Sequence, residues 1–264
     1  MSLRVNTNVA AMNAYRNLTV TEGQMGKSLE KLSSGFRINR AADDAAGLAI
    51  SEGLRSQIGG LKVGARNTQD GISVAQTAEG ALTEVHSMLQ RMNDLSVQYN
   101  NGTQNTESQA ALSAEFVALQ TEITRIQDNT KFNGVPLFDG EAKTFQVGYA
   151  SADTIEISAD ATRAFAGDIA GLAIDGGSDL VQAQVTAVST QRAELGAIQN
   201  RFEHTVNNLN VSIENLSASE SRIRDADMAQ EMVAFTRNQI LSQAGTSMLA
   251  QANQASQGVL SLLR

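Results

Sequence analysis

A repeat of seven residues places apolar side chains near the start of the chain, at Ala11, Leu18, Met25 and Leu32, and Leu29 supplies an intermediate step. An apolar stripe this narrow is typical of a helix in a coiled coil. The same period continues over residues 54–99, with Gly53 just before this stretch and Gly59, Gly60, Gly64, Gly71 and Gly80 interrupting it. Each interior glycine costs a helix about 0.5–1 kcal/mol relative to alanine, so this second helix is expected to need packing partners.

Two further helices are predicted beyond residue 100. A turn at 100–103 is followed by Thr106 and Gln109, which fit a capping box with the Thr106 hydroxyl as the acceptor, and this helix is expected to end near Asn129. The regular repeat returns after Ser178 and predicts one long helix, with apolar residues at Val188, Leu195, Phe202, Leu209, Leu216 and Ile223. The last segment, 228–264, is expected to form a weakly amphipathic helix with an apolar tip.

Between residues 130 and 177 the period changes to two. Phe145 and Val147 alternate with polar residues, as do Ile155 and Ile157, which predicts a β-hairpin, and Asn133-Gly134 reads as a turn. Leu172 and Ile174 suggest one more short strand. The expected fold is therefore mainly α, with long antiparallel coiled-coil-like helices from the N- and C-terminal regions and a small β-hairpin insert.

We expect two domains. Residues 1–40 and 225–264 would form an inner terminal helical domain that is disordered in the monomer, and 41–224 an outer helical domain whose β region spans about 135–177. Both ends carry apolar seams that no adjacent segment covers. Two interpretations follow from the pattern: the ends pack on each other as an antiparallel pair inside one globular domain, or they bury their seams against other subunits.

Composition narrows the function classes. The 264 residues include 20 Lys and Arg against 28 Asp and Glu, a net charge of −8, which argues against a nucleic-acid partner. With no cysteine the chain cannot form disulfides or thiolate metal sites. A single proline lets helices run without a forced break. No run of about 18 apolar residues occurs and the start lacks a cleavable signal pattern, so we expect neither membrane insertion nor a signal of that kind.

Candidate catalytic and metal-ligating residues are few. His86 and His204 have no neighbouring ligand in metal-binding order, so no metal or cofactor is expected. The pairs Asp43-Asp44 and Asp225/Asp227 are better interpreted as helix caps than as acid–base carboxylates. No nucleophile motif or phosphate-binding loop is complete, and we expect no enzyme.

Both ends of the chain also contain specific sequence motifs. Residues 5–11, 32–39 and 42–51 (VNTNVAA, LSSGFRIN and ADDAAGLAIS) resemble the N-terminal signature of bacterial flagellin. Residues 221–229, 239–254 and 259–264 (SRIRDADMA, QILSQAGTSMLAQANQ and VLSLLR) resemble the flagellin C-terminus. The resemblance covers about 1–140 and 178–264, and the middle lacks the large variable domains of many flagellins.

The resemblance implies a structural subunit that self-assembles into the helical flagellar filament and serves motility. It also implies secretion through the flagellum's own type III apparatus to an extracellular filament, an export chaperone, a filament cap and hook-junction proteins. The apolar residues at the ends are then expected to make subunit contacts; we assign this role to Leu18, Met25, Leu29, Leu32, Ile240, Leu241, Met248, Val259, Leu262 and Leu263.

Where flagellins are sensed by the innate receptor Toll-like receptor 5, a stretch of the outer helical layer is recognised, and residues 89–98 resemble that stretch. The positions carried over are Leu89, Gln90, Arg91, Leu95 and Glu115, and Asp94 stands where many members have Glu. The alternative is that Leu89, Met92 and Leu95 are seam residues and Arg91 a solvated neighbour. For the whole chain the rivals are a hook–filament junction protein, a monomeric helical binding module and, more remotely, an enzyme.

Overall fold

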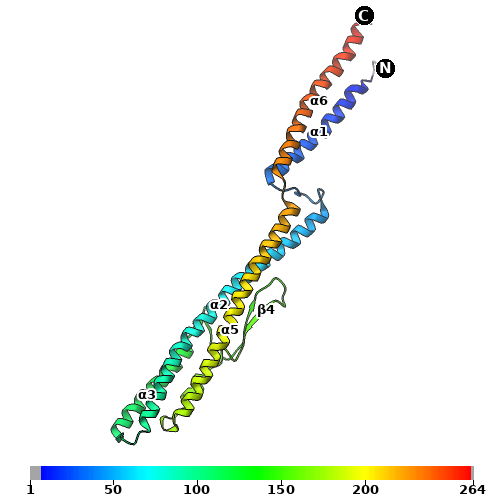
Figure 1. Cartoon of the computed structure of the whole chain (residues 1–264). Coiled ribbons are helices and arrows are strands. Elements are labelled where there is room, and N and C mark those ends of the chain that lie inside the picture. The colour runs from blue at the N-terminus through cyan, green and yellow to red at the C-terminus, as the bar shows by residue number, and fades with distance from the viewer. Residues whose placement is uncertain (1–6, 263–264) are drawn as a thin grey trace. The chain divides into compact units, whose positions relative to one another are not determined.

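The computed structural model describes the backbone of residues 7–262 and the side chains of residues 7–254. Five long helices dominate the described part: α1 (Val9–Ser34), α2 (Ala45–Tyr99), α3 (Thr106–Asn129), α5 (Ser178–Arg224) and α6 (Met228–Leu262) (Figure 1). The shorter elements are β1 (Lys131–Phe132), β2 (Val135–Pro136), β3 (Lys143–Gln146), β4 (Thr154–Ile157), α4 (Ala166–Ala170) and the 3₁₀ turn η1 (Ile174–Gly176). The predicted mainly α fold with a small β-hairpin insert is confirmed.

The chain divides into two compact units, one within residues 1–56 and 216–264 and the other within 57–215. We call them the terminal unit and the central unit. In the terminal unit α1 and α6 lie side by side (Figure 1). They run antiparallel, because the Asn8 amide donates to the Ala252 carbonyl at 3.0 Å while Lys31, near the other end of α1, lies 4.0 Å from Glu231.

The core of the central unit follows the predicted seams. Val188, Leu195 and Phe202, spaced seven residues apart on α5, are at most 1% exposed. They pack with apolar residues of α2, α3 and the β segment, among them Leu82, Val85, Leu89, Met92, Leu95, Phe116, Ile123, Ile155 and Ile157. Side chains this buried stabilise by about 1.5–3 kcal/mol each, which outweighs the cost of the glycines in α2.

The β segment matches the prediction in part. β3 and β4 pair antiparallel with Phe145 opposite Ile155, as predicted, but β3 ends at Gln146 and Val147 belongs to the connecting loop. β1 and β2, which were not predicted, are joined by Asn133 and Gly134 at φ 49° and 82°. Two residues at positive φ give a two-residue hairpin turn of the kind that Asn-Gly favours.

Two local predictions were wrong. The N-cap of α3 is Asn105 and not Thr106. The Asn105 side chain accepts from the Ser108 amide at 2.7 Å, so Thr106 is the first residue of the helix, one residue earlier than predicted. Ile174 begins a 3₁₀ turn and not a strand. Its carbonyl accepts from the Ser96 hydroxyl at 3.0 Å, and the Leu172 carbonyl accepts from the Gln120 amide at 2.8 Å. Helix side chains therefore satisfy this backbone, and it needs no strand partner.

The glycines of α2 allow close approach of the β3–β4 loop. A Cβ at Gly64 would lie 2.7 Å from the Val147 carbonyl carbon, whereas a Cβ at Gly80 would meet nothing within 4 Å. The packing therefore requires a glycine at position 64, whereas it does not at position 80 of the same helix.

Replacing Gly64 with alanine is expected to lower the free energy of unfolding by about 1–3 kcal/mol, because backbone must move to accept the methyl group. The matched change Gly80→Ala is expected to raise it by about 0.5–1 kcal/mol through helix propensity. Urea unfolding followed by circular dichroism measures both. Equal stability of the two variants would contradict the close packing at Gly64.

Candidate subunit interface

The inner seam of the terminal unit contains the predicted residues Leu18, Met25 and Leu32, which are half-buried. A Cβ at Gly245 of α6 would lie 3.3 Å from Leu18 Cδ1, so the small residue lets the leucine sit against α6. Polar residues also face inward, since Ser28 and Asn238 are only 5% and 8% exposed. The two helices thus use part of their apolar surface on each other, as the antiparallel-pair interpretation expected.

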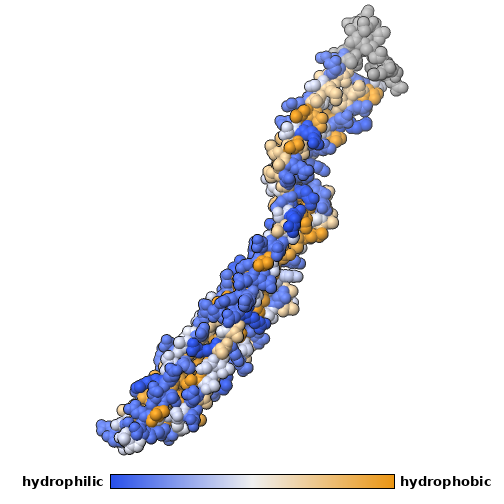
Figure 2. Space-filling view, in the orientation of Figure 1, coloured by the Kyte–Doolittle hydropathy of each residue, from blue (hydrophilic) through white to orange (hydrophobic). Residues whose placement is uncertain are grey.

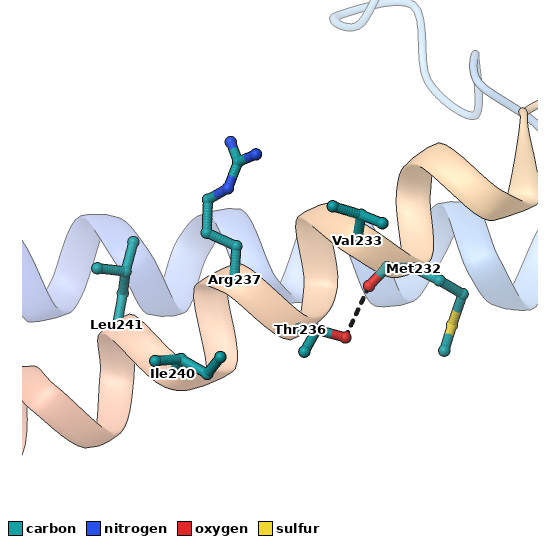
Figure 3. A pocket seen from close by; sticks show the side chains of 6 residues that line it. All are labelled: Met232, Val233, Thr236, Arg237, Ile240 and Leu241. Carbon is teal, nitrogen blue, oxygen red and sulfur yellow. Dashed lines mark hydrogen bonds between the residues drawn. The ribbon is translucent and has the colours of Figure 1, made fainter.

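The outer face of α6 is apolar and open. Val233, Ile240 and Met248 are 61%, 60% and 61% exposed, and Leu241 is 49% exposed. Figure 3 shows a shallow groove on this face, lined by Met232, Val233, Thr236, Arg237, Ile240 and Leu241. The Thr236 hydroxyl donates to the Met232 carbonyl at 2.9 Å, so even this hydroxyl is turned back onto its own helix.

A second open apolar surface lies on α1. Met12, Tyr15, Val20 and Leu29 are each more than half exposed, and Leu29, predicted as a contact, belongs to this outer set. Met12 and Tyr15 line a groove together with Leu249 of α6. Orange residues are visible along the α1 and α6 pair in Figure 2. Exposed apolar patches of this extent usually mark surfaces that bind another protein.

The predicted contact residues therefore fall into two groups. Leu18, Met25 and Leu32 lie on the inner seam, whereas Leu29, Ile240, Leu241 and Met248 lie outside. The side chains of Val259 and Leu262, and the whole of Leu263, lie outside the described residues. Sequence reasoning missed Met12, Tyr15, Val20, Met232, Val233 and Arg237. The structure supplies the missing distinction: half-buried or buried residues of α6 recur at Phe235, Asn238, Ser242, Gly245, Leu249 and Ala252, and the large apolar residues are offset from this repeat.

Backbone hydrogen bonds join the two segments that connect α1 to α2 and α5 to α6, at residues 35–37 and 224–226. The Arg37 amide donates to the Arg224 carbonyl at 2.7 Å, and the Ala226 amide donates to the Gly35 carbonyl at 2.9 Å. The Arg224 guanidinium reaches Glu52 at 2.6 Å and lies over the Phe36 ring, 4.9 Å from its centroid. These contacts hold the two joints, residues 35–37 and 224–226, together within the terminal unit.

Two of the four aspartates predicted as caps cap a helix. Asp44 accepts from the Gly47 amide at 2.8 Å at the start of α2, and Asp227 accepts from the Ala229 amide at 2.9 Å at the start of α6. Asp43 instead accepts from the Arg40 amide of the preceding turn at 3.0 Å, and this bond holds the pKa of its carboxyl below the usual value. The interpretation as caps is confirmed for Asp44 and Asp227 but not for Asp43 or for Asp225, which accepts from the Ser221 hydroxyl at 2.6 Å.

The receptor-like stretch has buried and exposed members. Leu89 and Leu95 are 0% exposed in the central core, where the alternative interpretation as seam residues expected them. Gln90 is exposed and contacts His86 through its side-chain amide at 3.1 Å. Arg91 pairs with Glu115 of α3 at 2.7 Å, and both side chains are about half exposed. On the free chain only Gln90, Arg91 and Glu115 of the predicted set offer side chains to a partner.

The described residues contain neither a membrane-spanning helix nor a metal-binding cluster. None of the described helices has an apolar stretch long enough to cross a bilayer. No group of three or more His, Cys, Asp or Glu side chains within the described part is arranged to hold a metal ion.

Comparison with known proteins matches both ends of the chain. Residues 5–143 match the bacterial flagellin N-terminal helical region, and residues 178–263 match the bacterial flagellin C-terminal helical region. A flagellin of Halalkalibacterium halodurans is 54% identical, covering 98% of this chain and 99% of that protein. A flagellin of Bacillus subtilis is 46% identical over 99% and 100% of the two chains, and the flagellar filament 33 kDa core protein of Treponema phagedenis is 44% identical over 98% and 99%. The chain belongs to the bacterial flagellin family.

Proposed function

We propose that this flagellin is a structural subunit of the extracellular flagellar filament, used for motility, and that the outer apolar faces of α1 and α6 make its contacts with neighbouring subunits. The observation that supports the assignment of these contacts is the exposure of Val233, Ile240, Leu241 and Met248 after α1 and α6 have already paired. Pairing within one chain leaves these side chains in water, and polymerisation removes them from it.

The α6 face supplies part of the free energy of assembly. Fully burying one large apolar side chain contributes about 1.5–3 kcal/mol. Val233, Ile240, Leu241 and Met248 are already about half covered within the chain, so covering the rest contributes about 3–6 kcal/mol in total before costs. Association costs about 4–15 kcal/mol in lost translational and rotational freedom, so the α1 surface must supply the remainder. Contacts between different faces of neighbouring copies generate an open helical polymer and not a closed pair.

The two parts of the subunit take different places in the proposed filament. Residues 1–40 and 225–264 form the inner terminal domain of the filament and 41–224 the outer domain, and the inner domain orders on assembly. Secretion runs through the flagellar type III apparatus, and an export chaperone covers the C-terminal segment beforehand. A cap protein and hook-junction proteins are the further partners at the two ends of the filament.

Growth from seeds tests the filament assignment. Purified protein is depolymerised by heat, cooled and mixed with short filament fragments, then examined by negative-stain electron microscopy and sedimentation. Long uniform filaments support the proposal. A compact monomer that never elongates supports the binding-module rival, and rings or stubs of limited length support the hook-junction rival.

Recognition by Toll-like receptor 5 is proposed for the exposed residues of the receptor-like stretch. Gln90, Arg91 and Glu115 present a planar amide and an ion pair across α2 and α3, and arginine is among the residues enriched at binding hot spots. Leu89 and Leu95 then act indirectly, by fixing the helix on the core.

The variant Arg91→Ala is expected to reduce activation of a receptor reporter by at least about tenfold, because a hot-spot arginine contributes about 2 kcal/mol or more. The matched variant Arg125→Ala removes an exposed arginine of a similar ion pair, with Glu122, and is expected to activate normally. Equal responses to both variants would remove Arg91 from the recognition surface.

A further inference from the structure

Arg237 is an isolated charge on the open face of α6. That helix contains two charged residues, Glu231 and Arg237, and Glu231 is near Lys31 on the inner side. Arg237 makes no hydrogen bond or ion pair with any described residue. Its neighbours on the helix surface are Val233, four residues before it, and Ile240 and Leu241, three and four residues after it. Figure 3 shows the guanidinium projecting from the same groove wall as Val233 and Leu241.

Covering this face requires a carboxylate from the partner. A charge taken out of water is costly unless an opposite charge and hydrogen bonds compensate it. Arginine also presents its donors as a planar fork that fits a carboxylate. Since Arg237 is the one charged side chain on this face, a second copy that covers it must bring an acid to this point.

Most acids of the terminal unit are already engaged. Glu30 binds Arg40 at 2.8 Å, Glu52 binds Arg224 and Glu231 is near Lys31. The four aspartates accept from backbone amides or from Ser221. Among the side chains described in residues 7–56 and 216–254, Glu22 and Glu220 remain without a partner.

The surroundings distinguish the two. Glu22 is exposed and lies seven residues from both Tyr15 and Leu29, which are 64% and 57% exposed, so it is in line with large apolar side chains on α1. Glu220 is half-buried, and the positions seven residues from it hold the half-buried Ile213 and the acidic Asp227. The Tyr15, Glu22 and Leu29 strip of α1 therefore resembles the face of α6, with large apolar side chains around one charge of opposite sign, and Arg16 lies beside it in the groove of Met12 and Val20.

We propose that Arg237 of one copy pairs with Glu22 of a second copy, with the α6 groove packed against the Tyr15, Glu22 and Leu29 strip of α1. This pair rests on the proposed function and specifies the register of its contact. Because Arg237 and Glu22 lie on different faces, every subunit offers one of each, and the contact repeats head to tail and does not close as a two-fold dimer.

Two charge reversals test the pair by complementation. The variant R237E carries glutamate at both positions, and E22R carries arginine at both, so either variant alone sets like charges against each other. Each alone is expected to elongate seeds at least about tenfold more slowly than wild type. In an equimolar mixture, every contact between a subunit of one variant and a subunit of the other pairs opposite charges. The mixture is therefore expected to recover growth to within about threefold of wild type.

The E220R variant is the matched control. Alone it is expected to elongate like wild type, and mixed with R237E it is expected not to restore growth. Recovery with E220R in place of E22R would overturn the assignment of Glu22. Wild-type growth of R237E and of E22R separately, or no recovery in their mixture, would overturn the pair while leaving the filament function standing. Failure of wild-type protein to elongate would instead overturn the filament function itself.

Discussion

Substituting aspartate for both Ile240 and Leu241 is expected to abolish filament growth at concentrations where wild type elongates. These side chains are 60% and 49% exposed on the free chain, so the substitution leaves the subunit's own packing intact. Because each side chain is already about half covered, the filament loses about 0.8–1.5 kcal/mol of burial for each. The lost burial raises the critical concentration by about tenfold to a hundredfold, and the cost of covering two carboxylates raises it further. Sedimentation of seeded reactions over a concentration series measures it.

The matched control places the same charges on the other side of the same helix. Gln239 and Thr246 are exposed and seven residues apart, on the side of α6 away from Ile240 and Leu241. The variant Q239D/T246D is expected to polymerise within about tenfold of wild type, and both double variants are expected to keep wild-type helicity by circular dichroism. Loss of growth in both would indicate that added charge anywhere on α6 is enough, and it would remove the special role of the groove.

The fold was predictable where apolar spacing is regular over many turns. On α5 the repeat runs through Val188, Leu195 and Phe202, and all three are buried. Long helices with one proline in the chain leave few alternatives to such a seam. The β3–β4 hairpin was also predictable, because Ile155 and Ile157 alternate as a half-buried strand requires.

The segment between β4 and α5 was not predictable from its own residues. Its backbone is satisfied by side chains remote in sequence: the Gln127 carbonyl oxygen accepts from the Phe165 and Ala166 amides, each at 2.7 Å, and Gln120 donates to Ile169 and Leu172. A glutamine on a helix carries no mark of the loop that it will bind. Alternation across Leu172 and Ile174 is too short to decide between a strand and a turn.

The candidate interface was predictable only as a region. Counting apolar residues identified both ends of the chain, but it could not separate Leu18, which faces Gly245, from Leu29, which faces outward. That separation depends on which face of α1 meets α6, and the two helices are over 190 residues apart in sequence. Arg237 was not predicted, because a single charge is ordinary on the surface of a helix. It becomes informative only when its neighbours are known to be apolar and exposed.

Phe202 is among the largest fully buried side chains of the central unit, and Phe202→Ala is expected to lower the free energy of unfolding by about 3–5 kcal/mol. The ring is 0% exposed, packs edge-on to Phe145 with centroids 5.5 Å apart, and occupies the space left open by Gly71. Because Gly71 has no side chain to fill the space, the cavity is expected to persist. Val211→Ala, on the same helix but 57% exposed, is expected to change stability by less than about 0.5 kcal/mol. Urea unfolding, together with hydrogen exchange of the backbone amides of residues 82–95, compares the stability of the two variants. A loss below about 1 kcal/mol for Phe202→Ala would show that the helices close over the cavity.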